Sequence, residues 1–312
     1  MTGYVDLQVN GYAGVDFNDA GLTAPALDHA LAAMAAGGVA QCLPTVITAA
    51  PDDMAARLHA LDRAVAASRF GPAMVPGYHL EGPFLNDAPG FRGCHPPQHM
   101  TDPDIPLTRR LLAGLQRPVL MMTLAPERFG AALFIRWLVS RGIIAAIGHA
   151  NATAPAVAEA VQAGAAMSTH LGNGLPATLP KLDNPIMAQL GEDALAAGFI
   201  ADGIHVPIPA LRAMLRAKGP GRAILVTDAV AAAAAPPGLY GFAGMVVEGR
   251  PDGSARLPAT GALAGSALTM QQAVRNVVEW AIATPAEAHA MAATTPARLI
   301  AHALRTRAAA SN

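Results

Sequence analysis

The sequence predicts an α/β protein of the (β/α)8 TIM-barrel class, with residues 1–312 forming a single barrel domain. Eight short runs of apolar and β-branched residues alternate with longer alanine-rich stretches of helical character, a pattern typical of a parallel sheet connected by helices. The length of 312 residues accommodates eight such units. The alternative is a doubly wound open sheet. It usually has fewer strands, and Gly11 and Gly14 alone are a weak match to its glycine-rich fingerprint.

The expected strands and helices alternate in order along the chain. The strands are Tyr4–Val9, Gln41–Thr48, Met74–Leu80, Val119–Leu124, Ile143–Ile147, Ala166–Thr169, Ala197–Ile200 and Ala223–Val226. The amphipathic stretches between them include Ala26–Ala36, Asp52–Ser68, Ala131–Ser140, Thr153–Ala163 and Ile208–Ala217. Proline favours the first turn of a helix, and Pro51, Pro207 and Pro209 stand at the expected starts of two of these helices.

Two irregular segments interrupt this alternation. Gly82–Pro106 is rich in proline and glycine, and Ala231–Ala262 contains an expected hairpin around Asp252 and Gly253. Loops this long within one domain are usually active-site loops, so we expect both at the functional end of the barrel.

The composition excludes several classes of protein. The chain is 53% hydrophobic and 14% charged, which is unlike a disordered protein. A net charge of −1, an aromatic content of 4% and the lack of a basic stripe argue against a nucleic-acid partner. Two cysteines, Cys42 and Cys94, are too few for a disulfide framework and fit a reducing compartment.

The high hydrophobicity does not predict a membrane partner. The best candidate span, Leu31–Pro51, is alanine-rich and is broken by glycine and proline. The first six residues have neither the basic nor the apolar region of a signal peptide. We therefore expect a cytoplasmic protein.

Polar residues gather where the predicted strands end. In a (β/α)8 barrel these carboxyl ends meet at one mouth, where the active site lies. The residues concerned are Gln8, Asn10, Glu81, His149, His170, Asp202, His205 and Asp228. Among them, Glu81, His149 and His170 match the carboxylate and imidazole set of an open zinc site.

Each of these residues also has a simpler interpretation. A single histidine at a strand end is more often structural than a ligand, and Glu81 beside Gly82 and Pro83 can cap a loop. Asp228 can be the N-cap of a short helix over Val230–Ala234, or it can be a carboxylate that takes a proton from water. Taken together, at four corresponding positions of a barrel, they favour a metal site.

The chain resembles the N-acetylglucosamine-6-phosphate deacetylases of the amidohydrolase superfamily in a series of short stretches that occur in the family's order. They are Asp6–Gly11, Val15–Asp19, Leu43–Thr48, His79–Leu85, Leu124–Glu127, Gly148–Thr153, Ser168–Leu171, Ala201–His205, Val226–Ala229 and Leu263–Met270. They extend over nearly the whole chain, and the resemblance covers the catalytic barrel.

This resemblance implies a metal-dependent amidohydrolase that removes an N-acetyl group from an amino sugar. Glu81, His149 and His170 would hold the ion, and Asp228 would be the catalytic base and then the acid. The superfamily often has His-x-His after the first strand, whereas this chain has Gln8 and Asn10, so we expect one divalent ion. Zinc is the first candidate, with Fe²⁺, Mn²⁺ and Co²⁺ as alternatives.

The resemblance also implies a set of substrate contacts. These residues are Gln8, Asn10, Cys94, His95, Asn173, Gly174, Lys181, Asp202, His205, Leu263, Ala264 and Gly265. His95 and His205 can equally be solvated loop imidazoles, and Asn173 a turn residue. Lys181 stands where the family has a phosphate-binding arginine. It can meet phosphate only as a point charge, or it can be an ordinary exposed lysine.

Two further departures from the family set the remaining expectations. The stretch after the second histidine reads Gly172–Pro176 in place of the family's Asn-Ala-Met. The segments that form a small β-sandwich in the family are expected to be reduced or absent here. The leading substrate is N-acetylglucosamine 6-phosphate, and a homodimer is possible. Another N-acyl amine, or a non-catalytic barrel that binds a sugar phosphate, are the alternatives.

Overall fold

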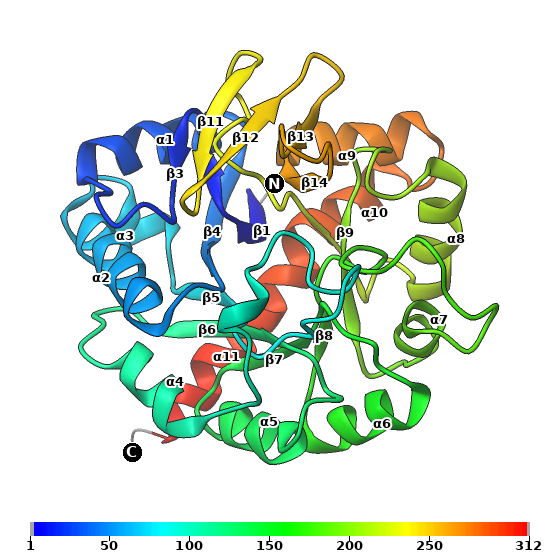
Figure 1. The fold of residues 1–312 in the computed structure, drawn as a ribbon. Coiled ribbons are helices and arrows are strands. Elements are labelled where there is room, and N and C mark those ends of the chain that lie inside the picture. Colours follow the sequence, from blue (N-terminus) through cyan, green and yellow to red (C-terminus); the bar gives the residue numbers. More distant parts are fainter. Residues whose placement is uncertain (1–2, 311–312) are drawn as a thin grey trace.

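Eight parallel strands close into a barrel in the computed structural model, which describes residues 3–310 (Figure 1). In order around the barrel they are β1 Tyr4–Val9, β4 Val39–Ile47, β5 Tyr78–Glu81, β6 Val119–Leu124, β7 Ile144–Ile147, β8 Met167–Ser168, β9 Ala196–Ile200 and β10 Ala223–Val226. The two ends of the sheet meet where the Asp228 N–H donates to the Gln8 carbonyl at 2.9 Å and Val9 bridges Ala229. The predicted (β/α)8 barrel is confirmed.

Seven of the eight strands lie within two residues of their predicted bounds, and the third does not. We expected it over Met74–Leu80, but Gly71–Met74 form the short helix α3 and β5 begins at Tyr78. Pro76 has no N–H to donate to a sheet. A Cβ on Gly77 would come within 2.4 Å of a backbone carbonyl oxygen of the chain beside it. Gly77 thus admits the neighbouring backbone, and the regular strand begins at Tyr78, whose N–H donates to the Pro118 carbonyl at 3.0 Å.

Helices surround the barrel on its outer face (Figure 1). They are α1 Ala24–Ala36, α2 Pro51–Ala67, α4 Ile105–Leu112, α5 Ala131–Ser140, α6 Ala154–Ala163, α7 Pro185–Leu190, α8 Ile208–Lys218 and α9 Met270–Glu279. Side chains cap several N-termini, as where Thr153 accepts the Ala156 N–H. Within residues 3–310, none of these helices is both long enough and apolar enough to cross a membrane.

The last helices close the end of the barrel where the strands begin. These elements are α10 Pro285–His289, the π-helix η2 Ala290–Thr294 and α11 Thr295–Ala310. Helix α11 contacts β1, β6 and β10 and crosses the barrel (Figure 1). It passes the start of β7 so closely that a Cβ on Gly142 would lie 2.5 Å from the Ala303 carbonyl oxygen. This end of the barrel is thereby covered.

The segment between β10 and α9 forms a four-stranded antiparallel sheet beside the barrel mouth (Figure 1). Its strands are β11 Gly238–Phe242, β12 Met245–Gly249, β13 Ser254–Arg256 and β14 Leu263–Ser266. The expected turn at Asp252 and Gly253 is confirmed, because it joins the paired strands β12 and β13. Ser266 attaches the sheet to the barrel by donating its backbone N–H to the Asp228 carbonyl at 2.8 Å.

Lys218, the last residue of α8, is a buried cation, with 1% of its surface exposed. Its Nζ donates to the backbone carbonyls of Glu192 at 2.7 Å and Leu195 at 3.0 Å. These carbonyls belong to the turn that leads into β9. Lys218 therefore anchors that turn to the end of α8.

Replacing Lys218 by methionine should lower the free energy of unfolding by about 2–4 kcal/mol, because the methionine fills the space but leaves two carbonyls without a donor. Urea denaturation at pH 7 measures this loss. Lys181→Met is the matched control, because Lys181 is exposed and its loss should cost less than about 0.5 kcal/mol. Equal losses in the two variants would contradict the anchoring role.

The stability difference between wild type and the Lys218→Met variant should also depend on pH. Burial lowers the pKa of Lys218 from 10.5 to about 8, so between these values the unfolded chain binds a proton that the folded chain does not. Stability rises with pH wherever the unfolded state binds more protons. The stability difference between wild type and Lys218→Met should therefore grow from pH 8 towards pH 10, and a constant difference would show that Lys218 keeps its ordinary pKa.

Candidate active site

A cavity of about 320 Å³ opens at the barrel mouth, where the strands end. Loops that follow different strands contribute its walls, as the barrel geometry predicts. It is lined by Asn10, Ile47, Glu81, Gly90, Gly93, Cys94, His95, His149, His170, Gly172, Asn173, Gly174, Leu175, His205, Asp228, Phe242, Leu263, Ala264 and Gly265. The cavity joins the irregular segment after β5 to the four-stranded sheet, so both long segments reach the functional end.

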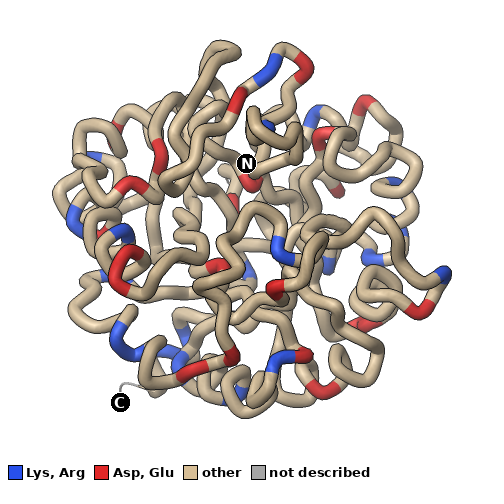
Figure 2. Tube along the Cα trace, viewed as in Figure 1, with Lys and Arg blue, Asp and Glu red and all other residues tan. Residues whose placement is uncertain are grey.

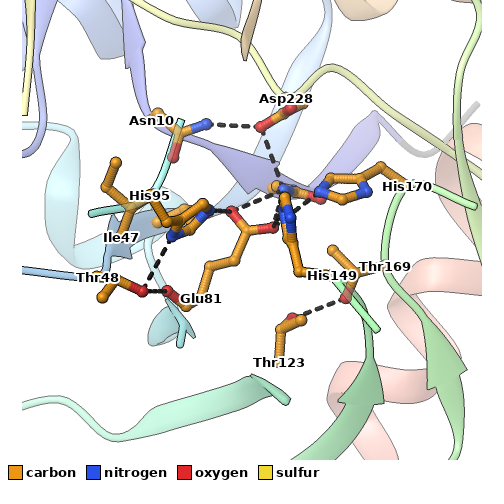
Figure 3. A network of polar contacts seen from close by, with 12 residues as sticks. Asn10, Ile47, Thr48, Glu81, His95, Thr123, His149, Thr169, His170 and Asp228 are labelled. Carbon is orange, nitrogen blue, oxygen red and sulfur yellow. Dashed lines mark hydrogen bonds and ion pairs between the residues drawn. The ribbon is translucent and has the colours of Figure 1, made fainter. Parts of the chain in front are cut away.

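The Glu81 carboxylate lies at the centre of a cluster of imidazoles (Figure 3). Glu81 Oε1 is 2.8 Å from His170 Nε2 and 3.3 Å from His149 Nε2. Glu81 Oε2 is 3.8 Å from His95 Nε2. One ligand atom each from Glu81, His95 and His149 lies within 4.8 Å of the other two. The cluster therefore offers more imidazoles than the two we predicted as ligands.

The hydrogen bonds of these histidines suit a metal site. His149 Nδ1 is 2.7 Å from the Phe91 carbonyl oxygen, so it carries the proton and leaves Nε2 with a free lone pair. His170 Nδ1 is buried and has no hydrogen-bond partner. His95 Nδ1 is 2.9 Å from the Thr48 hydroxyl. The cluster presents one carboxylate oxygen and imidazole nitrogens to a common point, which is the donor chemistry of a divalent metal site.

Electrostatics inside the cluster favour a bound cation. Burial disfavours the Glu81 charge, but the nearby His149 and His170 imidazoles outweigh this effect and hold the pKa of Glu81 well below 4.5. Burial likewise opposes the charge on His170, yet the Glu81 carboxylate raises the pKa of His170 to about 9. Burial, with His149 beside it, lowers the pKa of His95 to about 3, so His95 stays neutral. Glu81 is thus a buried anion whose charge is stabilised by positive charge beside it.

Asp228 lies beside this cluster and is held by two side-chain amides. Asn10 Nδ2 donates to Asp228 Oδ1 at 2.7 Å (Figure 3). Gln8 Nε2 donates to the same oxygen at 3.1 Å. Gln8 Nε2 also lies 3.2 Å from Glu81 Oε1, so one amide contacts both carboxylates. Burial raises the pKa of Asp228 to about 6. Asp228 Oδ2 receives neither amide and is available for proton transfer.

The backbone at three of these residues is strained. His149, His170 and Asp228 have φ of 50°, 28° and 50°, a region that residues other than glycine seldom adopt. Each follows the end of a barrel strand by two residues. Strain of this kind is retained where the surrounding structure enforces it, and it clusters at functional sites.

Close packing holds the His149 ring in place. A Cβ on Gly174, whose φ is 61°, would lie 2.6 Å from His149 Nδ1. A Cβ on Gly93 would lie 2.9 Å from His149 Cε1. Gly174, in the run Gly172–Pro176, must therefore be glycine because the His149 ring lies against it. The sequence alone does not reveal this reason.

Beneath the cluster, a series of buried polar side chains joined by hydrogen bonds lies inside the barrel. His79 Nδ1 lies 3.2 Å from the Thr45 hydroxyl, and His79 Nε2 lies 2.7 Å from the Thr123 hydroxyl. Thr123 in turn lies 2.7 Å from the Thr169 hydroxyl. Burial lowers the pKa of His79 to about 4, so it is neutral. No function was predicted for these residues, because threonines in or beside a strand carry no recognisable sequence signal.

The structure brings most of the expected substrate contacts to the cavity. His95 and Cys94 line it on one side, and Asn173 and Gly174 on another, as do the three residues at the start of β14. Gln8 lies just below, through its bonds to the carboxylates. The apolar lining residues Ile47, Leu175 and Phe242 were missed, because nothing in the sequence distinguishes them from core residues.

Besides Gln8, two expected contacts, Asp202 and Lys181, lie outside the lining of the cavity. Asp202 holds the lining residue His205, because its Oδ2 lies 2.6 Å from His205 Nδ1. Burial raises the pKa of Asp202, but the contact with His205 outweighs burial and lowers it. Lys181 is exposed on the loop before α7 and is not among the lining residues. Lys181 therefore does not line the cavity in which we expected it to bind phosphate.

Comparison with known proteins points to one group of enzymes. No protein-family model matches the chain. It is 36% identical over 299 residues to an N-acetylgalactosamine-6-phosphate deacetylase of Escherichia coli O157:H7, covering 95% of this chain and 77% of the relative. It is also 36% identical over 324 residues to an N-acetylglucosamine-6-phosphate deacetylase of Danio rerio, covering 96% of this chain and 74% of the relative.

Solved structures give the same result. A mutant N-acetyl-D-glucosamine-6-phosphate deacetylase of Mycobacterium smegmatis, in complex with N-acetyl-D-glucosamine-6-phosphate, is similar with a TM-score of 0.87 and 32% identity, over 96% of this chain and 77% of that one. The N-acetylglucosamine-6-phosphate deacetylase of Thermotoga maritima has a TM-score of 0.84 and 25% identity, over 96% of this chain and 78% of that one.

Proposed function

The chain belongs to the N-acetylglucosamine-6-phosphate deacetylase family, and from this premise we propose that it hydrolyses N-acetylglucosamine 6-phosphate to glucosamine 6-phosphate and acetate. The observation that supports this most directly is the buried cluster in which Glu81 contacts two imidazoles beside the Asp228 carboxylate. A binding protein needs no such proton-accepting group next to a metal site. The cluster therefore favours a hydrolase over a non-catalytic sugar-phosphate barrel.

We propose that Glu81, His149 and His170 hold one divalent ion, with zinc as its identity. Glu81 Oε1 lies between the Nε2 atoms of the two histidines, and His149 carries its proton on the opposite nitrogen. A divalent ion in such a set acidifies water and polarises a carbonyl. His95, neutral and bonded to Thr48, is left to donate to the substrate.

Asp228 moves the proton in this proposal. Its Oδ1 is occupied by the amides of Gln8 and Asn10, so Oδ2 accepts the proton of the attacking water and later gives it to the departing amine. The two amides fix the carboxylate plane and cannot take the proton themselves. Hydrolysis needs both transfers, because an amine leaves an amide carbon only when protonated.

The remaining lining residues are proposed to bind the sugar phosphate. Asp202 holds His205 Nδ1 and so orients the opposite ring nitrogen, and the Asn173 amide lines the same cavity. Phosphate is a strong acceptor and binds imidazole and amide donors. Leu263–Gly265 supply a wall for the sugar ring.

Because both cysteines are unpaired thiols, we further propose the reducing cytoplasm as the location of the protein.

Acetate release tests the function directly. With zinc supplied, the protein should deacetylate N-acetylglucosamine 6-phosphate faster than the unphosphorylated sugar, and a chelator should abolish the activity until zinc is restored. N-acetylgalactosamine 6-phosphate belongs in the same assay, because relatives of both specificities match the chain equally well. A preference for the unphosphorylated sugar would redirect the proposal to another N-acyl amine, and no acetate from any substrate would refute it.

Replacing Asp228 by asparagine should lower kcat by about 10²–10⁴-fold, the usual contribution of an acid–base group. Asparagine keeps the shape of the side chain and accepts a hydrogen bond, but it cannot take up a proton. Metal content and the circular dichroism spectrum should be unchanged. A kcat close to that of wild type would remove Asp228 from the mechanism.

The choice of metal ligands is tested by a pair of histidine variants. His170→Asn should weaken zinc binding by more than about 100-fold, since losing a ligand costs more than losing a group that only supports one. His95→Asn should leave zinc affinity within about tenfold and raise KM instead. Competition with a zinc-chelating dye measures both affinities. The opposite pattern would assign the ion to Glu81, His95 and His149, the other group that the geometry allows.

A further inference from the structure

Asp6 is a buried carboxylate that the proposed reaction does not use. It lies on β1 two residues before Gln8, and alternate residues of a strand share one face. Most charged positions of the chain follow the outer helices and loops (Figure 2), whereas Asp6 has none of its surface exposed. A carboxylate is costly to bury unless donors surround it, so its partners indicate what it does.

The partners of Asp6 connect it to the residue before Asp228. The Thr227 hydroxyl donates to Asp6 Oδ2 at 2.5 Å, and the Thr227 backbone N–H donates to Asp6 Oδ1 at 3.2 Å. The Gln8 backbone N–H donates to the same Oδ1 at 3.3 Å. Asp6 thus holds both Thr227 and Gln8, the residue whose amide contacts the Asp228 carboxylate.

The Thr227 hydroxyl forms a turn around Asp228. Its oxygen accepts the Ala229 N–H at 3.1 Å, so one hydrogen bond spans the residue whose φ is 50°. Hydroxyl bonds of this kind stabilise tight turns of the backbone. A hydroxyl has a single hydrogen, and Asp6 Oδ2 takes it, which leaves a lone pair of the Thr227 oxygen for Ala229.

The peptide groups on both sides of Asp228 are held as well. The Asp228 N–H donates to the Gln8 carbonyl at 2.9 Å, and the Asp228 carbonyl accepts the Ser266 N–H at 2.8 Å. Only the strained turn between them then depends on a side chain. Strain at a functional residue persists where neighbouring groups enforce it, and Thr227 with Asp6 supplies that enforcement.

We propose that Asp6 and Thr227 are positioning residues for the proposed deacetylation, and that they direct Asp228 Oδ2 towards the water and the departing amine. This inference rests on the proposed function. Neither residue lines the mouth cavity, so both act through Asp228 and not by touching the substrate. The alternative is that the pair only fastens β1 to β10, in which case its loss would lower stability without a specific effect on turnover.

Threonine variants separate these two roles. Thr227→Val keeps the shape of the side chain but removes the hydroxyl, and it should lower kcat for N-acetylglucosamine 6-phosphate about 10- to 100-fold, because a misdirected acid–base group transfers protons poorly. KM should stay within about twofold of wild type, because no substrate contact is lost. Thr227→Ser retains the hydroxyl and should keep kcat within about threefold of wild type. Burial raises the pKa of Asp6 to about 7, so the assays are made at pH 8, where Asp6 is ionised.

Thr295→Val is the matched control for the loss of a buried hydroxyl. Thr295 is 3% exposed, and its hydroxyl donates to the Pro220 carbonyl at 3.1 Å, at the closed end of the barrel. This variant should lose stability in urea as Thr227→Val does, but its kcat should equal that of wild type. If Thr227→Val turned over as fast as wild type, or no more slowly than Thr227→Ser, the positioning role would be wrong.

Asp6→Asn tests whether Asp6 acts through the hydroxyl. Asparagine keeps the oxygen that accepts the two backbone N–H groups but replaces Oδ2 by a donor, so the Thr227 hydroxyl must turn to the Gln8 carbonyl, 3.3 Å away. Asp6→Asn should lower kcat at least about threefold in wild type and should not lower it further in Thr227→Val. No loss in wild type, or an equal loss in both backgrounds, would remove Asp6 from the pair.

The wild-type protein separates this inference from the function on which it rests. Wild type that releases no acetate would refute the proposed function and the positioning role together. Active wild type with an equally active Thr227→Val variant would overturn the positioning role alone. If Thr227→Val does not fold by circular dichroism, Asp6→Asn removes the same contact from the other side, and its kcat decides the question.

Discussion

The burial of one negative charge dominates the organisation of this protein. Glu81 has 2% of its surface exposed, and a carboxylate taken out of water is unstable unless positive groups and hydrogen-bond donors surround it. His149, His170 and Gln8 supply these partners at distances of 2.8–3.3 Å. The same demand draws the imidazoles together into the donor set in which we propose a divalent cation. Stability and chemistry at the mouth therefore have a common electrostatic origin.

The barrel satisfies this demand by bringing distant segments to one place. Gln8, Glu81, His149, His170 and Asp228 lie at or just after the carboxyl ends of five different strands, and parallel pairing sets all five strand ends at one level. Positive φ angles at three of them turn the chain sharply, two residues after the strand ends. Close approach by glycine then fixes the His149 ring. The order of the strands determines which of these residues lie next to one another, and the local backbone geometry determines where each side chain points.

The sequence predicted the parts of this arrangement that depend on periodicity and on strand ends. Glu81 and His149 were recognisable because each polar residue ends an apolar run, whereas His79 resembles them in sequence and forms a neutral hydrogen-bonded link below the site. The start of β5 was predicted too early, because the apolar run before it resembles a strand although Pro76 has no N–H to donate and Gly71–Met74 form a helix. The cavity at the amino ends of β6 and β7 was also not predicted, because its lining comes from segments that only the folded chain brings together.

The two lysines of this chain differ so completely in accessibility that they give the protein an unusual chemical property. Lys218 is enclosed and bonded to two carbonyls, which leaves Lys181 as the one accessible lysine within residues 3–310. Lys181 lies on the loop that follows Leu175 of the mouth cavity. An amine-reactive dye or surface linker would therefore modify lysine at a single position, beside the mouth cavity and without any engineered cysteine.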